Sequence, residues 1–405
     1  MKITYVVQRT FPDLLNGSER YIHDLSSSVS SQYEVALLAT RKYKSNNVNN
    51  LIGNQQIVTF SEFPINLLTS PIRYGISSLQ NQELLNIYSS VFKGFLHSSS
   101  MGFFSLTMKH YLNTHKSDIF HVAAVPTATA WLTWRVSTKR GIPLVITPFL
   151  HYTLMDHNVT YIKEMLKESS AVIAVTEKER QRIITLGVSE SNVHVIPLGI
   201  DYKKYDKVRQ TAFREQHNID EDSFVILIPR KSKGKGTFDT LKAIVSLSEK
   251  YKNLTLILLD EASKKDRSEL EYYKKRLFIN GVTVIDVGFV TGLDLVTAYQ
   301  ACDVVVEPSK VDSFGIIYLE AWACEKPVIA ADVGAIPDIV HNNKNGLIVK
   351  FGDCKGIEDA MYQLINDAVF KRMLGENGKK DVKTKYALDN MVKKTKIIYN
   401  RFEDF

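Results

Sequence analysis

The sequence is poor in cysteine and contains no long hydrophobic run. Its three cysteines, Cys302, Cys324 and Cys354, form no C-x-x-C pair, so neither a disulfide framework nor a structural zinc site is expected. No stretch approaches the roughly 18 apolar residues of a membrane span. The start, MKITYVVQRTF, is too brief a run for a signal peptide. These absences predict a cytoplasmic protein with reduced thiols.

Acidic residues are scarce in one part of the chain. Between residues 64 and 155 the only acids are Glu83 and Asp118, against seven lysines and arginines, and aromatic side chains are frequent. Such a stretch could attract an anionic surface at the inner face of the membrane, or it could be an ordinary solvated face. No basic run is dense enough to predict nucleic-acid binding.

Short β-branched runs alternate with amphipathic helical stretches from end to end. Most of these runs are apolar along their whole length, which is typical of parallel strands buried on both faces. The pattern predicts an α/β protein with two doubly wound, Rossmann-like domains facing each other across a cleft. The expected strands are residues 3–7, 34–38, 118–122, 144–147, 171–175, 193–197, 224–229, 254–259, 282–287, 303–306, 327–331 and 346–350.

The boundary between the two domains is expected where the strand pattern gives way to PLGIDYKKYDK. We predict a first domain over 1–200, a second over 201–385 and a terminal helix over 386–405. Residues 60–115 fit the strand–helix rhythm poorly and are predicted to form a helical insertion in the first domain.

The densest cluster of polar residues follows the expected strand at 303–306, in EPSKVDSFGIIYLEAW. There, residues 313–315 lead into a helix whose first amides form a natural phosphate site. Asp312 approaches this site from the loop. Glu320 should reach back to ligand hydroxyls from a solvent-accessible cleft, because helical side chains tilt towards the N-terminus. The plainer alternative makes Glu320 a solvated helix residue and Asp312 a helix cap.

Cations occur at the matching place in the same domain, in the loop RKSKGKG after the strand at 224–229. Arg230 and Lys235 can neutralise a diphosphate without a metal, and the glycines beside the lysine let the backbone approach a ligand. Because the carboxyl ends of parallel strands share one edge of a sheet, this loop should lie beside Asp312.

The first domain offers weaker candidates. Gly17 and Ser18 precede a helix, and their amides should lie near the predicted cleft. His151 follows the strand at 144–147 directly, so it is either a catalytic group or a structural hydrogen-bonding residue. His121 ends another strand and is a weaker candidate still.

The second-half cluster resembles that of the family 4 glycosyltransferases, which are retaining, nucleotide-sugar-dependent enzymes of the GT-B fold. Their motif places two acids eight positions apart, as Asp312 and Glu320 are here, inside a proline–serine … phenylalanine–glycine … glutamate–alanine frame. VIPLGID, VGAIPDIV, NGLIV and the basic glycine loop are further matches. The residues that match the frame are Pro308, Ser309, Phe314, Gly315, Glu320 and Ala321.

The resemblance implies a role for each candidate residue. Arg230 and Lys235 would stabilise the departing diphosphate, Asp312 would contact the donor sugar, and His151 would contact or position the sugar. Glu320 would bind the ribose. The residues implied in donor binding are Gly17, Ser18, Arg230, Lys235, Ser313, Phe314, Gly315, Ile316 and Glu320.

The resemblance also implies an activity of the EC 2.4 class. A hexosyl group would move from a UDP- or GDP-sugar to a hydroxyl of a glycan, a glycolipid or a small acceptor, with no metal or other cofactor. The first domain would bind the acceptor, the second the nucleotide sugar, and the terminal helix would cross back to the first. The sequence departs from the family's pattern at Asp312, where a glutamate is usual, and at Pro229 and Ser18, where glycines are usual.

Other interpretations start from the same residues. Asp220-Glu221-Asp222 superficially fits the Asp-x-Asp motif of metal-dependent glycosyltransferases, but it precedes a strand, at the end away from the predicted site, and is predicted to be a turn. A sugar-nucleotide epimerase of the same fold would use carboxylates as acid–base groups and need no acceptor. An inactive nucleotide-sugar-binding scaffold is the third interpretation.

Overall fold

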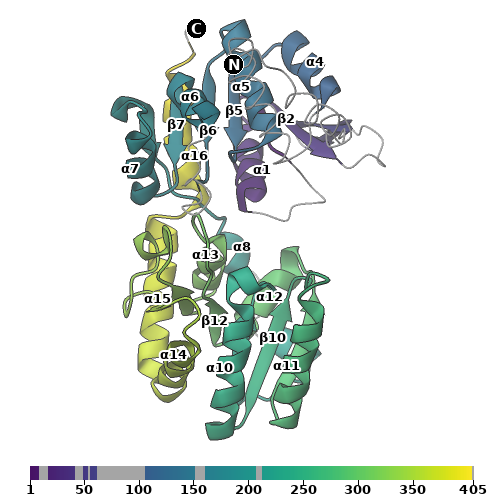
Figure 1. Ribbon diagram of the computed structural model, residues 1–405, viewed down its shortest axis with the longest axis vertical. Helices are drawn as coiled ribbons and strands as arrows, with labels where there is room; N and C mark the ends of the chain where they lie inside the picture. Colours follow the sequence, from purple (N-terminus) through teal and green to yellow (C-terminus); the bar gives the residue numbers. More distant parts are fainter. Residues whose placement is uncertain are drawn as a thin grey trace, which may run out of the picture. The chain divides into compact units, whose positions relative to one another are not determined.

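The computed structural model describes residues 1–8, 17–41, 49–52, 55–61, 105–150, 160–206 and 212–403. The chain forms two compact units (Figure 1). The first combines Met1–Leu198 with Asp389–Phe405, and the second is Gly199–Leu388. The two ends of the second unit are paired, since Ile200 forms a β-bridge with Ala387 and its N–H donates to the carbonyl of Tyr386 at 2.9 Å.

The first unit is built on a sheet with strand order β3-β4-β2-β1-β5-β6-β7-β8. All neighbours are parallel except β3 and β4. The six strands expected in this half are confirmed. The hairpin β3–β4 was not predicted, because its sequence is rich in asparagine and glutamine. The strands are β1 (Lys2–Val6), β2 (Glu34–Arg41), β3 (Asn49–Ile52), β4 (Gln55–Ser61), β5 (Ile119–Ala123), β6 (Leu144–Thr147), β7 (Ala171–Ala174) and β8 (Val193–Val195).

Helices of the first unit begin and end at recognisable signals. Thr127 caps α5 by accepting the N–H of Ala130, and Gly141 ends that helix in the left-handed conformation.

Of the expected insertion at 60–115, only the two ends are described, and residues 62–104 lie outside the described part. The helices are α1 (Gly17–Val29), α4 (Leu106–Thr114), α5 (Ala128–Arg140), α6 (Thr160–Glu168) and α7 (Glu177–Thr185), with the short 3-10 helix η1 (Glu190–Asn192).

The second unit has a fully parallel sheet with strand order β11-β10-β9-β12-β13-β14. The six expected strands are confirmed. The order reverses between β9 and β12, and open α/β sheets bind ligands at the carboxyl ends of the strands at such a point. The strands are β9 (Phe224–Ile228), β10 (Leu254–Leu259), β11 (Thr283–Gly288), β12 (Val304–Glu307), β13 (Val328–Ala331) and β14 (Leu347–Val349).

Helices cover this second sheet. Apolar side chains of α10, α11 and α14 share one core with side chains of β9, β10 and β12, while α13 packs against α12 and α15. The helices are α8 (Lys203–Asp206), α9 (Ala212–Gln216), α10 (Thr237–Lys250), α11 (Arg267–Ile279), α12 (Gly292–Ala301), α13 (Ile316–Ala323), α14 (Cys354–Asn366) and α15 (Ala368–Thr384), with the 3-10 helices η2 (Lys233–Lys235) and η3 (Ile336–Asp338).

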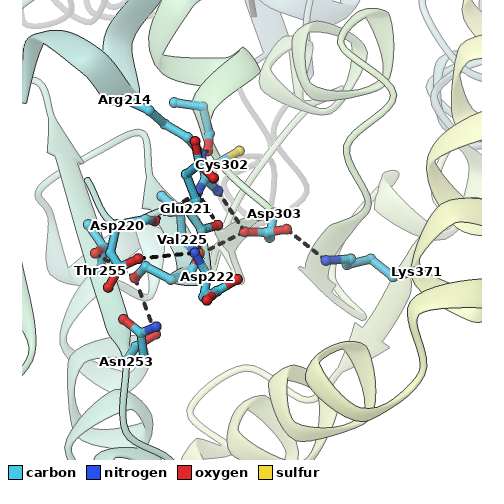
Figure 2. Close-up of polar contacts among 12 residues, drawn as sticks. Arg214, Asp220, Glu221, Asp222, Val225, Asn253, Thr255, Cys302, Asp303 and Lys371 are labelled. Atoms are coloured by element: carbon cyan, nitrogen blue, oxygen red, sulfur yellow. Dashed lines mark hydrogen bonds and ion pairs between the residues drawn. The ribbon is translucent and has the colours of Figure 1, made fainter. Parts of the chain in front are cut away.

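The amino-terminal edge of this sheet carries a structural ion cluster (Figure 2). Asp303, just before β12, accepts hydrogen bonds from Arg214 at 3.1 Å and from Lys371 at 2.7 Å. Arg214 also donates to the backbone carbonyls of Asp220 and Glu221, at 3.3 Å each. The acidic triplet that begins at Asp220 is therefore a turn, as predicted, and lies at the edge opposite the candidate site.

The last helix, α16 (Leu388–Asn400), continues into the first unit, where Figure 1 draws it in yellow among the teal elements. Its Tyr399 hydroxyl is bonded to the hydroxyl of Tyr5 at 3.0 Å and to Nδ1 of His121 at 2.5 Å. Nε2 of His121 bonds Thr147 at 2.9 Å. Burial lowers the pKa of His121 to about 3, so the ring is neutral at physiological pH. His121 is thus a structural residue.

No helix among the described residues is both long enough and apolar enough to cross a bilayer.

Replacing Tyr399 with phenylalanine tests how much this buried contact contributes. The change should lower the free energy of unfolding by about 1–3 kcal/mol, because it leaves Nδ1 of His121 and the hydroxyl of Tyr5 without their shared partner in the core. Urea denaturation followed by circular dichroism measures the loss.

Tyr33→Phe is the matched control. The Tyr33 hydroxyl donates at 2.8 Å to Asn400, which lies on α16 as Tyr399 does, but this contact is exposed. Loss of the Tyr33 hydroxyl should therefore change the free energy of unfolding by less than about 0.5 kcal/mol. Equal effects of the two substitutions would contradict a special role for the buried contact.

Candidate functional site

Two loops meet at the carboxyl edge of β9 and β12. The first runs from Arg230 through η2 to α10, and the second runs from the end of β12 to α13. The first is fixed internally, because the hydroxyl of Thr237 accepts the N–H of Ser232 at 3.0 Å and donates to the carbonyl of Arg230 at 2.5 Å. The N–H of Lys310 then joins the second loop to the carbonyl of Gly234 at 2.9 Å.

Gly236 allows the close approach of these loops. Its φ is +73°, and a Cβ atom there would lie 2.4 Å from the carbonyl oxygen of Pro308. Such a distance is below van der Waals contact, and a positive φ strains any residue with a side chain. Gly315, which caps α13, has a φ of +83°. A Cβ atom there would lie 2.4 Å from the ring of Tyr318.

Lys235 lies where the loops meet. Its ammonium is 2.8 Å from Oδ2 of Asp312 and 3.4 Å from Oε1 of Glu307. Oδ1 of Asp312 accepts the N–H of Phe314 at 3.1 Å, so Asp312 links the lysine to the start of α13. Burial disfavours the charged lysine, but the two carboxylates outweigh it and raise the pKa of Lys235. The structure therefore brings together two predicted residues, Lys235 and Asp312. The alternative that Asp312 caps the helix was wrong, because the cap is Gly315 and no side chain accepts a capping hydrogen bond there.

Glu307 was missed by sequence reasoning. It is the last residue of β12 and is only 2% exposed. Ser309 donates to its Oε1 at 3.2 Å, and Oε2 has no hydrogen-bond partner among the residues the structure describes. Burial raises the pKa of this carboxyl, while the charge of Lys235 acts in the opposite direction. The signal in the sequence was an acid closing an otherwise apolar strand, VVVE.

Glu320 differs from both expectations. It is 3% exposed, so it is neither on an accessible cleft wall nor solvated. The hydroxyl of Tyr299, from α12, donates to Oε2 at 2.8 Å, and that of Tyr205, from α8, donates to Oε1 at 3.3 Å. The expectation of an accessible Glu320 was wrong because these two helices cover it, and no local pattern in the sequence indicates that packing.

The remaining predicted residues near α13 lie at its start. Phe314 and Gly315 are buried, and Ser313 and Ile316 are half-buried. The ring of Phe314 packs edge-on against Tyr386, with ring centres 5.9 Å apart. Only the backbone of Phe314 therefore faces Asp312.

The candidates of the first unit are only partly described. Gly17 and Ser18 open α1, while His151 lies outside the described residues. Leu150, the residue before it, is held by Glu179, which accepts the N–H groups of Leu150 and Val175 at 2.7 Å each. Burial raises the pKa of Glu179 to about 7, against the lowering effect of these two hydrogen bonds. Sequence reasoning missed Glu179 too.

Family comparisons cover nearly all of this architecture. Residues 15–204 match the model of Glycosyltransferase Family 4, and residues 209–381 match that of Glycosyl transferases group 1. The first half of the chain is therefore a family 4 glycosyltransferase domain and the second half a group 1 domain, and the protein is a glycosyltransferase. Among the interpretations drawn from the sequence, the transferase is the one that these two domains support.

Curated relatives and solved structures agree with this assignment. The glycosyltransferase is 27% identical over 314 residues to the capsular polysaccharide biosynthesis glycosyltransferase CapM of Staphylococcus aureus, covering 73% of this chain and 80% of that protein. It superimposes on sucrose-phosphate synthase from Thermosynechococcus elongatus with a TM-score of 0.75 at 18% identity, covering 99% and 98% of the two chains.

A second solved structure, Anabaena Alr3699/HepE in complex with UDP and glucose, gives a TM-score of 0.72 at 18% identity and covers 99% of each chain. Together with the two Rossmann-like sheets, these likenesses show that the glycosyltransferase has the GT-B fold.

Replacing Gly236 with alanine tests the close approach of the two loops. The new Cβ would collide with Pro308 and adopt a strained φ, so the free energy of unfolding should fall by more than about 2 kcal/mol. Gly234→Ala is the control two residues away, where the nearest atom to a new Cβ is Oγ of Ser232 at 3.9 Å. Urea denaturation compares them, and equal tolerance of both would contradict the packing described here.

Proposed function

We propose that this glycosyltransferase moves a hexosyl group from a UDP- or GDP-sugar to a hydroxyl of a glycan or lipid-linked acceptor, with retention of configuration. The contact that carries the proposal is the one between Lys235 and Asp312 at the start of α13. It joins a cation suited to a diphosphate with a carboxylate suited to sugar hydroxyls.

In the proposed reaction the diphosphate replaces Asp312 as the partner of Lys235. Phosphate oxygens are strong acceptors for an ammonium and a guanidinium, so Arg230 and Lys235 together stabilise the charge that develops on the leaving group. Asp312, released from Lys235, accepts hydrogen bonds from the donor sugar. The positive charges of Arg230 and Lys235 neutralise the negative charge of the departing diphosphate.

The bond from the anomeric carbon to the diphosphate breaks, and the departing oxygen keeps the electron pair. The acceptor hydroxyl oxygen bonds to the same face of that carbon, and its proton passes to the departing diphosphate. In this scheme the first unit binds the acceptor, and Gly17, Ser18 and His151 are its contribution to the reaction.

Relatives support the substrate classes. The Anabaena neighbour was solved with UDP and with UDP-glucose, and the CapM relative is named for capsular polysaccharide biosynthesis. We propose accordingly a nucleotide-sugar donor and a cell-surface glycan or its lipid-linked precursor as acceptor. The acid-poor stretch at 64–155 supports a peripheral contact with anionic lipid at the cytoplasmic face of the membrane.

Lys235→Met tests the proposed diphosphate contact. Removing a charge-assisted contact worth about 1.5–3 kcal/mol should weaken the binding of UDP or GDP by about 10- to 100-fold, as measured by isothermal titration calorimetry. Release of nucleotide from a panel of UDP- and GDP-sugars should fall with it.

Lys233→Met is the control in the same loop. That side chain is 66% exposed and pairs with Glu269 at 2.7 Å, away from Asp312, so nucleotide binding should not change. Unaltered binding in Lys235→Met, or no binding of either nucleotide by the unsubstituted protein, would overturn the proposed function.

A further inference from the structure

We propose that Glu307 is a positioning residue that holds the Lys235 ammonium in place and lowers the affinity of the site for the diphosphate. The proposal rests on the proposed function, because it concerns the same leaving group. Its consequence is that Glu307 limits how tightly the nucleotide product stays bound.

Glu307 is fixed in place on three sides. It ends β12, the strand beside β9 in the middle of the sheet. Ser309 donates to its carboxylate, and the hydroxyl of Tyr318 donates to its backbone carbonyl at 2.8 Å. Its neighbour Pro308 is the residue against which Gly236 packs. The carboxylate is therefore built into the frame that aligns the two loops.

Two carboxylates compete for one ammonium. Asp312 lies closer to Lys235 and is the more exposed of the two, with 12% of its side chain exposed against 2% for Glu307. An incoming diphosphate can displace Asp312 towards solvent and ligand, but it cannot displace a buried side chain without unpacking the strand end. Glu307 thus stays beside Lys235 when the nucleotide binds.

The charge on Glu307 decides the net charge that the nucleotide meets. Arg230, Lys235, Glu307 and Asp312 are four ionisable groups of the site. When all four are ionised, their two positive and two negative charges cancel, whereas protonation of Glu307 leaves a net charge of +1. Burial favours that protonation and Lys235 opposes it. A proton on Oε2, the oxygen without a described partner, would disturb no described hydrogen bond. The charged or titratable groups acting on Glu307 are Arg230, Lys235 and Asp312 from the two loops, with Tyr299 from α12 and Tyr318 from α13.

Glu307→Gln removes the charge and keeps the shape. Dissociation constants of UDP and GDP would be measured by titration calorimetry at pH 5.5, 7.0 and 8.5. At pH 8.5 the variant should bind the nucleotide about tenfold tighter than the unsubstituted protein, because one buried negative charge beside the diphosphate is gone. As the pH falls and Glu307 takes up a proton, the ratio of the two constants should fall towards one.

The ratio of the dissociation constants of the two proteins at one pH reports on Glu307 alone, because ionisation of the nucleotide changes both constants by the same factor. Glu358→Gln is the matched control, a glutamate of the same unit that is 5% exposed and accepts a hydrogen bond from Ser246 at 2.9 Å on α10. There the ratio should stay near one at every pH. A ratio for Glu307→Gln that does not change with pH, or tighter binding by the unsubstituted protein, would overturn the role of Glu307.

Proton uptake provides a measurement that does not depend on the variant folding. Calorimetry of the unsubstituted protein at pH 7.0 with UDP- and GDP-sugars, whose diphosphates do not titrate near neutrality, in buffers with different ionisation enthalpies, should detect net uptake of protons, since the bound diphosphate favours protonated Glu307. No uptake, or net release, would contradict the proposal. If Lys235→Met weakens binding while these tests fail, only the role of Glu307 falls; if neither nucleotide binds, the proposed function falls with it.

Discussion

One ammonium shared by two carboxylates organises the second unit's candidate site. Lys235 can reach both Glu307 and Asp312 only because the loops after β9 and β12 touch, and they touch because Gly236 carries no side chain against Pro308. The strand order supplies the rest, since it places these strands side by side with their carboxyl ends at one edge. Backbone geometry and charge therefore depend on each other here.

The charges of Arg230, Lys235, Glu307 and Asp312 sum to zero. The side chain of Lys235 is 27% exposed, and its partial burial alone disfavours the ammonium, whereas the two carboxylates raise its pKa and keep it charged. In the proposed reaction a diphosphate takes the place of Asp312 beside Lys235, so the ammonium keeps an anionic partner throughout.

The fold and part of the site could be predicted from the sequence for identifiable reasons. Strands such as AVIA at β7 are apolar throughout because both faces are buried, and the shared sheet edge predicted that Lys235 and Asp312 would meet. Strands β3 and β4 were not predicted because their polar residues hide the strand pattern. Glu307 was not predicted as a site residue because a single acid after an apolar run looks like a loop residue. Glu320 was wrongly predicted to be accessible because Tyr205 and Tyr299, which cover it, come from distant segments.

The C-terminal helix has a consequence for the order in which the chain folds during synthesis. The first unit's core is completed by Tyr399, whereas the second unit is continuous from Gly199 to Leu388. During synthesis, Tyr5 and His121 are therefore made long before their shared partner, with the whole second unit between them in the sequence. A chain truncated just before Tyr399 would keep every residue of the second unit and lack a core contact of the first.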